Sequence, residues 1–518
     1  MGINTITAFL YDCLSVTLPD VNDQSPAQQT APYADAVCAY AREDWLRLNV
    51  PGHAADAERF GQLARLVGER PLRLDVAPLL DGIDLGDANP MERALELAAQ
   101  AWGARRTWFL TNGASQGNRI AVLASKALGD TLVVQRSVHS SVVDGLVLSG
   151  QRAAFVYPSV DFDLGIAHGV TADDLATAIA EHPDAAAAYL VTPSFFGAVA
   201  DVAACAEVAH AAGLPLIVDE AWGSHFGFHL SLPGSALAQG ADLVISSTHK
   251  LAASLTQSAM LHLGEGPFAD TLEPLIERAF HLTQSTSASA LLLASLDVAR
   301  QALVNGRARI NASLDAADGI RFQIRSAGRF RIVSDGFDRF DDIVGTDPLR
   351  ISVDTRAGGI SGHQTRRRLM REHRIVVEVA TDSAIVAVIG AGAAPGTDRF
   401  VEALHALPAP LREKPLADRL RLPVPGRVEM TVREAFLAPA RTVSAHEAIG
   451  QVSADTLAAY PPGIPNVLPG EVITASLVDF FQHTVAAPDG HVRGAADATM
   501  RTLRVVDRTA ETGRYRIR

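Results

Sequence analysis

Lys250 and Asp219 are the two residues whose type and position most strongly suggest catalysis. Each follows a short apolar run, residues 243–246 and 214–218, so each lies where a buried strand is expected to end. A carboxylate in such a place is unfavourable unless a cation or a hydrogen-bond donor pairs with it. Lysine is rare in this chain: Lys126, Lys250 and Lys414 are the only lysines among 45 basic residues. A general need for positive charge therefore does not explain a lysine at a strand end.

A glycine-containing turn, TNGASQG at residues 111–117, is the third segment of interest. It follows an apolar strand and precedes an expected helix. The first N–H groups of a helix, together with its positive dipole end, form a natural site for a phosphate or a carboxylate. The side chains of Ser115 and Gln116 add further donors. A tight turn with a serine cap would account for the same residues, so the turn is informative only in combination with Asp219 and Lys250.

Together these segments match the needs of pyridoxal phosphate. Its phosphate requires an anion site, its pyridine nitrogen requires a carboxylate that keeps it protonated, and its aldehyde requires a lysine amine for a Schiff base. Ligands of an open parallel sheet bind at the carboxyl ends of the strands, where all three segments are expected. The sequence therefore predicts a pyridoxal-phosphate site with Lys250 as the Schiff-base lysine and Asp219 beside the ring nitrogen.

A serine hydrolase is the rival interpretation of the same residues. The segment 113–117 also fits G-x-S-x-G, the nucleophile elbow, with Ser115 as the nucleophile. Asp219 and a later histidine follow it in the chain order of α/β-hydrolases. This interpretation leaves Lys250 and the serines before it unexplained.

The elements expected between residues 90 and 265 alternate between strands and helices. Strands 214–218 and 243–246 show almost no polar alternation, which indicates an α/β fold with a mostly parallel sheet covered on both faces. Further strands are expected at 107–110, 131–134, 153–156 and 187–191, and helices at 34–48, 94–102, 115–128, 140–148, 171–180 and 202–212. Residues 272–305 are expected to be mostly helical. A smaller alternating unit follows, with strands at 330–333, 349–353, 375–378 and 385–389 and a helix at 364–372.

Changes in composition divide the chain into four expected parts. These are a leader with one helix at 1–50, a large domain at 51–310, a small α/β domain at 311–407, and a linker with a C-terminal domain at 408–518. The leader up to about residue 30 ends in DVNDQSPAQQTAP, which is polar and rich in Pro and Gln, and residues 408–426 are rich in Pro and Arg.

The composition argues against several functions. A net charge of -13 provides no general basic surface for nucleic acid or anionic lipid. Apolar runs are far shorter than the roughly 20 residues of a membrane span. The N-terminus has no basic region before its apolar residues, so we expect no signal peptide and a cytoplasmic location. The three cysteines are scattered and show no C-x-x-C spacing, so we expect no disulfide framework. The chain also has no HExxH motif or cysteine cluster, so we expect no metal site.

Longer motifs make the chain resemble the ornithine/lysine/arginine decarboxylase family of fold-type-I pyridoxal-phosphate enzymes. They are PGH (51–53), TNGASQGN (111–118), HSSVVDGLVLSG (139–150), TPSFFGAVAD (192–201), VDEAWGSHFGFH (218–229), STHK (247–250) and YPPGIPNVLPGE (460–471). The resemblance is to the shorter members without an N-terminal receiver-like domain. It implies an aspartate-aminotransferase-like large domain and decarboxylation of a basic amino acid (arginine, lysine or ornithine), as in polyamine biosynthesis. It also implies a homodimer or larger oligomer with shared active sites.

The resemblance also implies a role for each matched residue. Lys250 would hold the cofactor and return a proton, Asp219 would pair with the ring nitrogen, and His139 would stack on the ring. Glu471 would bind the basic end of the substrate. The phosphate contacts would be Gly113, Ala114, Ser115, Gln116, Ser247 and His249, the pocket wall Ala221 and Trp222, and the contact to the partner subunit's phosphate Thr286 or Ser287.

Three departures from the family pattern leave the substrate and the reaction open. Residues 54–56 are Ala-Ala-Asp where the family commonly has Lys and glycines, and Ser140 stands where a lysine is frequent. Phe195 and Phe196 occupy a place where a tyrosine is usual, so a hydroxyl is missing near the cofactor. Transamination or deamination with the same cofactor therefore remains an alternative to decarboxylation.

Overall fold

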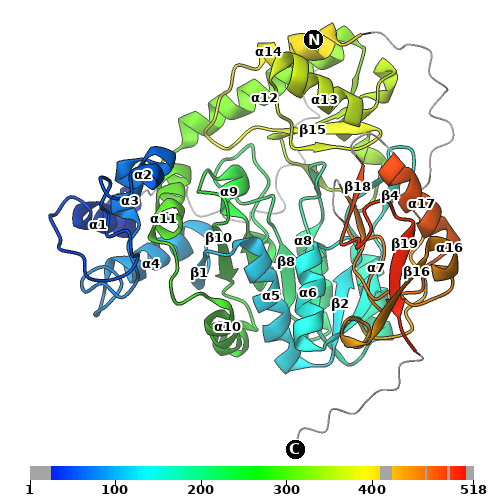
Figure 1. Cartoon of the computed structure of the whole chain (residues 1–518), viewed down its shortest axis with the longest axis horizontal. Coiled ribbons are helices and arrows are strands. Elements are labelled where there is room, and N and C mark those ends of the chain that lie inside the picture. The colour runs from blue at the N-terminus through cyan, green and yellow to red at the C-terminus, as the bar shows by residue number, and fades with distance from the viewer. Residues whose placement is uncertain (1–24, 409–422, 461–463, 487–489, 509–518) are drawn as a thin grey trace, which may run out of the picture.

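A seven-stranded sheet forms the centre of the computed structural model, which describes residues 25–408, 423–460, 464–486 and 490–508 (Figure 1). Residues 1–24 of the expected leader, residues 409–422 of the expected linker and the C-terminal residues 509–518 lie outside the described residues. The strand order is β1-β10-β9-β8-β6-β2-β3. The strands are β1 (Arg106–Leu110), β2 (Thr131–Gln135), β3 (Arg152–Val156), β6 (Ala185–Val191), β8 (Leu216–Asp219), β9 (Leu243–Ser246) and β10 (Ala259–Leu263).

The sheet is mostly parallel, as predicted, and the expected α/β architecture is confirmed. Parallel pairing joins β3 to β2, β2 to β6, β6 to β8 and β8 to β9. β10 is the exception, because it runs antiparallel to both β1 and β9. The sequence did not indicate β10, since its five residues follow a polar segment and include His262.

Helices cover both faces of this sheet. Leu132, Val134 and Tyr189 pack toward α5 (Gly113–Ser125), α6 (Ser140–Ser149) and α10 (Ala269–Thr283). Val133 and Leu190, the neighbours of these residues along the strands, pack toward α7 (Ala172–Glu181) and α8 (Val202–Ala211). This alternation follows from the two-residue period of a strand and explains why the strands are apolar throughout.

The N-terminal helices lie at one end of this sheet, beside α11 (Figure 1). The predicted helix 34–48 is wrong at its end, because α1 stops at Tyr40. The next residues are charged and form a turn in which Trp45 stacks on Tyr40, with ring centroids 5.0 Å apart. The N-terminal helices are α1 (Pro32–Tyr40), α2 (Gly61–Val67), α3 (Glu69–Leu74) and α4 (Pro90–Trp102). Later in the chain come α9 (Thr248–Leu251), α11 (Ala290–Val304) and α12 (Arg307–Ala327).

A four-stranded antiparallel sheet follows, at the top of Figure 1. Its order is β11-β13-β15-β14, and α12, α13 and α14 accompany it. The predicted strand 375–378 is displaced. The helix α13 ends at His373, the next residue Arg374 is left-handed, and residues 375–378 form the connection to β14. The elements are β11 (Arg331–Ile332), β13 (Arg350–Asp354), β14 (Val379–Ala380), β15 (Ala384–Val388), α13 (Gly362–His373) and α14 (Asp398–Ala406).

The C-terminal part packs against the large sheet near β2 and contains two-stranded sheets (Figure 1). They are β16 (Ala440–Ser444) with β19 (Thr502–Val506), and β17 (Ala458–Tyr460) with β18 (His491–Arg493). Its helices are α15 (Val432–Leu437), α16 (Ala445–Ala448) and α17 (Ala475–Ala486). Short strands elsewhere form the pairs β4 (Val160–Asp161) with β5 (Ile166–Ala167), and β7 (Ala198–Val199) with β12 (Gly345–Thr346). Across the described ranges, we find no helix long and apolar enough to cross a membrane.

Candidate active site

Lys250, Asp219 and His139 meet at the carboxyl edge of the large sheet. Asp219 is the last residue of β8, and Lys250 lies in the short helix α9 directly after β9. His139 follows β2 and caps α6. Because β2, β8 and β9 run in the same direction, these residues share one edge of the sheet. The charges of Asp219 and Lys250 both act on the imidazole of His139, so the three side chains form one electrostatic cluster.

The Lys250 amine is unusually easy to deprotonate. Its Nζ lies 3.8 Å from the centroid of the Trp222 ring, and the side chain is half-buried. Burial lowers the pKa of Lys250 to about 8, and the nearby Arg350 guanidinium also lowers it, whereas the carboxylates of Asp219 and Glu378 oppose the shift. A neutral amine is the nucleophile needed to attack an aldehyde, so this environment suits Schiff-base chemistry.

This environment predicts how Lys250 reacts as the pH changes. In cofactor-free protein, we expect labelling of Lys250 by an amine-selective reagent to rise with pH and reach half its maximum near pH 8. The reason is that a lowered pKa increases the neutral fraction of the amine at any given pH. Peptide mass spectrometry can follow Lys250 and the partly exposed Lys126 in one sample. A Lys250 profile that still rises above pH 10 would contradict this assignment.

Asp219 is buried and held by two donors. Its Oδ2 accepts a hydrogen bond of 2.9 Å from Asn118 Nδ2, and its Oδ1 accepts one of 3.0 Å from the backbone N–H of Ala221. Asn118 Oδ1 in turn accepts a hydrogen bond of 2.9 Å from the Tyr189 hydroxyl. A carboxylate has about four acceptor positions, so two bonds leave capacity for a further donor such as a protonated ring nitrogen.

The predicted phosphate turn opens α5. Gly113 has a φ of +71°, and its N–H donates to Gln257 O over 2.7 Å, which leaves the following N–H groups of Ala114 and Ser115 at the helix start. The Ser115 hydroxyl has no hydrogen-bond partner among the described residues. Gln116 is already engaged, because its Oε1 accepts from Asn112 N and its Nε2 donates to Gln284 Oε1. Gln116 therefore shapes the turn rather than offering a free side-chain donor.

Ser247 and His249 flank the reactive lysine. His249 Nδ1 donates to the Ser258 carbonyl over 2.9 Å and lies 3.3 Å from Ser247 Oγ. Since Nδ1 carries the proton, Nε2 must take up a second proton before it can donate to a phosphate. Burial lowers the pKa of His249, whereas the hydrogen bond to Ser258 and the charge of Glu378 oppose that shift, and a bound anion would further favour the second proton.

Thr286 and Ser287 are exposed in the turn between α10 and α11. Ser287 Oγ lies 3.1 Å from Ser285 Oγ, and its backbone N–H donates to the same hydroxyl. Their contact with a partner subunit's phosphate stays a prediction.

Glu471 is buried at the carboxyl end of β2, paired with Arg136. Its Oε2 lies 2.9 Å from Arg136 Nη2 and accepts a hydrogen bond of 2.8 Å from Leu468 N. Arg136 follows β2 and also donates to the carbonyl of Pro465. Because Pro465 and Glu471 belong to the C-terminal part, these bonds stabilise its packing against the large sheet. Glu471 Oε1 has no partner within the described ranges, which leaves one oxygen for another ligand.

The Arg136–Glu471 pair predicts a large effect on stability. The two side chains are 5% and 2% exposed. Glu471→Gln leaves a buried guanidinium without its counter-charge, which costs about 3–5 kcal/mol. We expect a clear fall in the urea midpoint of the C-terminal part. The exposed pair of Glu96 and Arg93 offers the control, because Glu96→Gln should leave the midpoint unchanged. Equal urea midpoints for Glu471→Gln and the parent would show that the Arg136–Glu471 pair does not stabilise the packing of the C-terminal part.

Arg350 is a site residue that the sequence did not indicate. This first residue of β13 is buried, and its Cζ lies 4.2 Å from the centroid of the Trp222 ring. Its Nη1 donates to Phe195 O over 2.8 Å. The predicted pocket residues Ala221 and Trp222 are both buried, and Phe195 packs edge-on against Trp222 with centroids 5.6 Å apart. Arg350 is about 100 residues from Lys250 in sequence, so no local motif could connect the two.

The serine-hydrolase interpretation is wrong. Ser115 is the third residue of α5 rather than the apex of a strand-to-helix elbow. No histidine of the described chain hydrogen-bonds to the Ser115 hydroxyl. The side chain bonded to Asp219 is the amide of Asn118, which cannot act as a base.

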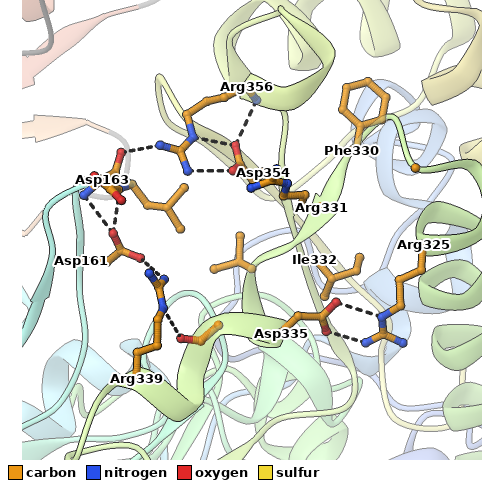
Figure 2. Close-up of a pocket in the computed structure, with 14 residues that line it drawn as sticks. Asp161, Asp163, Arg325, Phe330, Arg331, Ile332, Asp335, Arg339, Asp354 and Arg356 are labelled. Carbon is orange, nitrogen blue, oxygen red and sulfur yellow. Dashed lines mark hydrogen bonds and ion pairs between the residues drawn. The ribbon is translucent and has the colours of Figure 1, made fainter. Parts of the chain in front are cut away.

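A pocket of about 480 Å³ is lined by none of the predicted site residues (Figure 2). Six of its charged side chains form ion pairs: Asp354 with Arg356, Asp335 with Arg325, and Asp161 with Arg339. The last of these pairs joins the β4–β5 hairpin to the residues after β11, and Arg356 also donates to the Asp163 carbonyl. These interactions connect the β4–β5 hairpin to the part of the chain that contains the four-stranded sheet, and the pocket lies between the two.

The order of the large sheet and the reactive residues along its edge define a fold-type-I enzyme. The Orn/Lys/Arg decarboxylase major domain matches residues 31–336, and the C-terminal domain of the same enzymes matches residues 426–490. The chain is 32% identical to an arginine decarboxylase of Bacillus subtilis over 486 residues, 93% of this chain and 98% of that protein. It therefore belongs to the Orn/Lys/Arg decarboxylase family, and it is an amino-acid decarboxylase.

Lysine decarboxylases are also similar to this chain. The constitutive lysine decarboxylase of Escherichia coli is 23% identical over 575 residues, 90% of this chain and 79% of that protein. The crystal structure of the lysine decarboxylase LdcF of Francisella novicida superposes with a TM-score of 0.78 at 20% identity, covering 93% of this chain and 82% of that one. This structural likeness shows the fold alone. Because some relatives are named arginine decarboxylase and others lysine decarboxylase, the comparisons do not identify the substrate of this chain.

Proposed function

We propose that this chain decarboxylates a basic amino acid with pyridoxal phosphate as its cofactor. The observation that carries the proposal is the Lys250 amine, whose pKa is about 8, at the same strand edge as the Asp219 carboxylate. The residues fit the cofactor: an available lysine, a carboxylate with spare acceptor capacity and an unengaged hydroxyl at a helix start. When bound, pyridoxal phosphate forms a Schiff base with an amine and accepts the electrons left by departing carbon dioxide.

Each residue then has a defined task. Lys250 Nζ binds the cofactor aldehyde and afterwards returns a proton to the substrate carbon. Asp219 keeps the proton on the pyridine nitrogen, which preserves the electron-withdrawing charge of the ring. His139 stacks on the ring, and Trp222 with Ala221 forms the pocket wall. Ala114 and Ser115 bind the phosphate with Ser247 and His249, while Gly113, whose N–H donates to Gln257 O, and Gln116 shape the turn.

The basic end of the substrate is assigned to Glu471. Burial raises the pKa of this carboxyl, while Arg136 favours the charged form. A guanidinium or ammonium group would approach Oε1, the oxygen that Arg136 leaves unused. Arginine, lysine and ornithine all meet this requirement and differ in length and head-group geometry. We also propose a homodimer or larger oligomer, in which Thr286 or Ser287 reaches the partner subunit's phosphate.

The test is carbon dioxide release by the cofactor-loaded protein from arginine, lysine, ornithine, and a panel of neutral and acidic amino acids. Carbon dioxide and the matching amine from one basic substrate would support the reaction and identify the substrate. If the substrate lost its amino group and no carbon dioxide were released, the reaction would be transamination or deamination rather than decarboxylation. Absence of the visible Schiff-base absorption after incubation with pyridoxal phosphate would refute the cofactor.

A further inference from the structure

A chain of buried hydrogen bonds connects Asp219 to His139. Asn118 Nδ2 lies 2.9 Å from Asp219 Oδ2 and 2.9 Å from Ser141 Oγ. Ser141 Oγ lies 2.8 Å from His139 Nδ1, and the Ser141 backbone N–H also reaches that nitrogen, at 3.2 Å. Asn118, Ser141 and Tyr189 are all buried. Asp219 and His139, the two residues assigned to the cofactor ring, are thus connected through Asn118 and Ser141.

The chemistry of the groups fixes the direction of every bond. An ionised carboxylate only accepts, so the end of Asn118 that faces Asp219 must be the amide nitrogen. The other end then accepts from the Tyr189 hydroxyl over 2.9 Å, and burial raises the pKa of that tyrosine, which keeps the hydroxyl protonated. The second hydrogen of the Asn118 amide points to Ser141 Oγ, so the serine hydroxyl is free to donate its own hydrogen to His139 Nδ1.

Two donors therefore converge on His139 Nδ1: the Ser141 hydroxyl and the Ser141 backbone N–H. A ring nitrogen that accepts a hydrogen bond carries no proton of its own, so the neutral imidazole has its proton on Nε2. Burial also lowers the pKa of His139, and the charges of Lys250 and Arg493 add to this while Asp219 and Asp144 oppose it. Nε2 itself has no hydrogen-bond partner among the described residues.

We propose that Asn118 and Ser141 are positioning residues that hold His139 as the neutral Nε2–H tautomer, so that this imidazole acts in the amino-acid site as a hydrogen-bond donor and never as a base. The tautomer follows from the hydrogen bonds alone, whereas the donor role in the reaction rests on the proposed function. A neutral ring also stacks on a pyridinium without the repulsion that an imidazolium would bring. The donated hydrogen suits a carboxylate, the group that every amino-acid substrate carries.

The first test is nitrogen NMR on the full chain with ¹⁵N-labelled histidine rings, recorded with and without bound pyridoxal phosphate. His139→Gln identifies the His139 signals. At neutral pH we expect a protonated Nε2 and an unprotonated Nδ1 in the parent. Ser141→Ala removes the hydroxyl donor at 2.8 Å and keeps the longer backbone donor at 3.2 Å, so both signals should shift part of the way toward a mixture of tautomers. Ser149→Ala is the matched control, because that serine lies at the other end of α6 and contacts only Leu146 O and Gln151 N.

Each outcome decides the proposal. A protonated Nδ1 or an imidazolium in the parent overturns it, as do His139 signals that Ser141→Ala leaves unchanged. The cofactor-free spectrum gives this answer even if pyridoxal phosphate does not bind, so failure of the tautomer and failure of the proposed function are separable.

The second test asks whether the Nε2–H group is used in the reaction. Glutamine places an amide N–H near the position of His Nε2, whereas leucine offers none. We expect His139→Gln to retain decarboxylation within about tenfold and His139→Leu to lose about a hundredfold. Equal losses for the two variants would refute a donor role, since stacking alone would not distinguish them in this way.

Discussion

Lys250→Ala is expected to abolish turnover, with a loss of at least about a thousandfold in kcat. Lys126 cannot replace this amine, because it is held by Asp130 at the opposite end of α5. The visible absorption of bound cofactor should disappear with the activity, because it requires a Schiff base to the protein. Spectra and carbon dioxide release on the same preparation measure both effects.

Lys126→Ala provides the control for Lys250→Ala. It removes a lysine that pairs with Asp130 near the protein surface, and we expect activity and absorption like those of the parent. Reduction with borohydride before digestion should then place the cofactor on the peptide with Lys250. A variant with alanine at 250 that keeps both colour and turnover would exclude Lys250 as the cofactor lysine.

The site residues that could be predicted from the sequence are those that directly follow parallel strands, because such residues share the carboxyl edge of the sheet. Apolar runs mark β8 and β9, and a parallel sheet puts the residues after them at a common edge. Asp219 and Lys250 were therefore predictable as a pair, although 31 positions separate them. The glycine turn before α5 was predictable for the same reason. The domain boundaries and the cofactor contacts stay predictions.

The supporting residues could not be predicted in this way, since their role depends on side-chain directions across layers. Tyr189 is one of several buried residues in β6, and only the structure shows its hydroxyl on the Asn118 amide. Asn118 lies within the TNGASQGN motif but one turn beyond the helix start. Arg136 and Arg350 meet their partners across the boundaries between parts of the chain, where sequence periodicity carries no information.

Asp219→Asn is expected to lower kcat by about a hundred- to a thousandfold while the protein stays folded. Asparagine has nearly the same shape and retains one acceptor oxygen for Asn118 or Ala221. It lacks the negative charge that, in the proposed function, keeps a proton on the ring nitrogen, so the electrons left by carbon dioxide would be withdrawn less strongly. Weaker retention of pyridoxal phosphate on dialysis should accompany the loss. Turnover is measured at saturating cofactor, so that the two effects are separated.

Asp242→Asn is a close control for this loss. Asp242 is buried like Asp219, with exposures of 1% and 3%, but it precedes β9 and therefore lies at the amino edge of the sheet. Its Oδ2 accepts from Leu216 N and bonds His210, and burial raises the pKa of this carboxyl. Removing its charge should change stability and leave kcat at saturating cofactor unaffected. If both substitutions lowered kcat equally, the effect of Asp219 would be structural. A loss confined to Asp219→Asn would mean that its charge acts on the ring nitrogen.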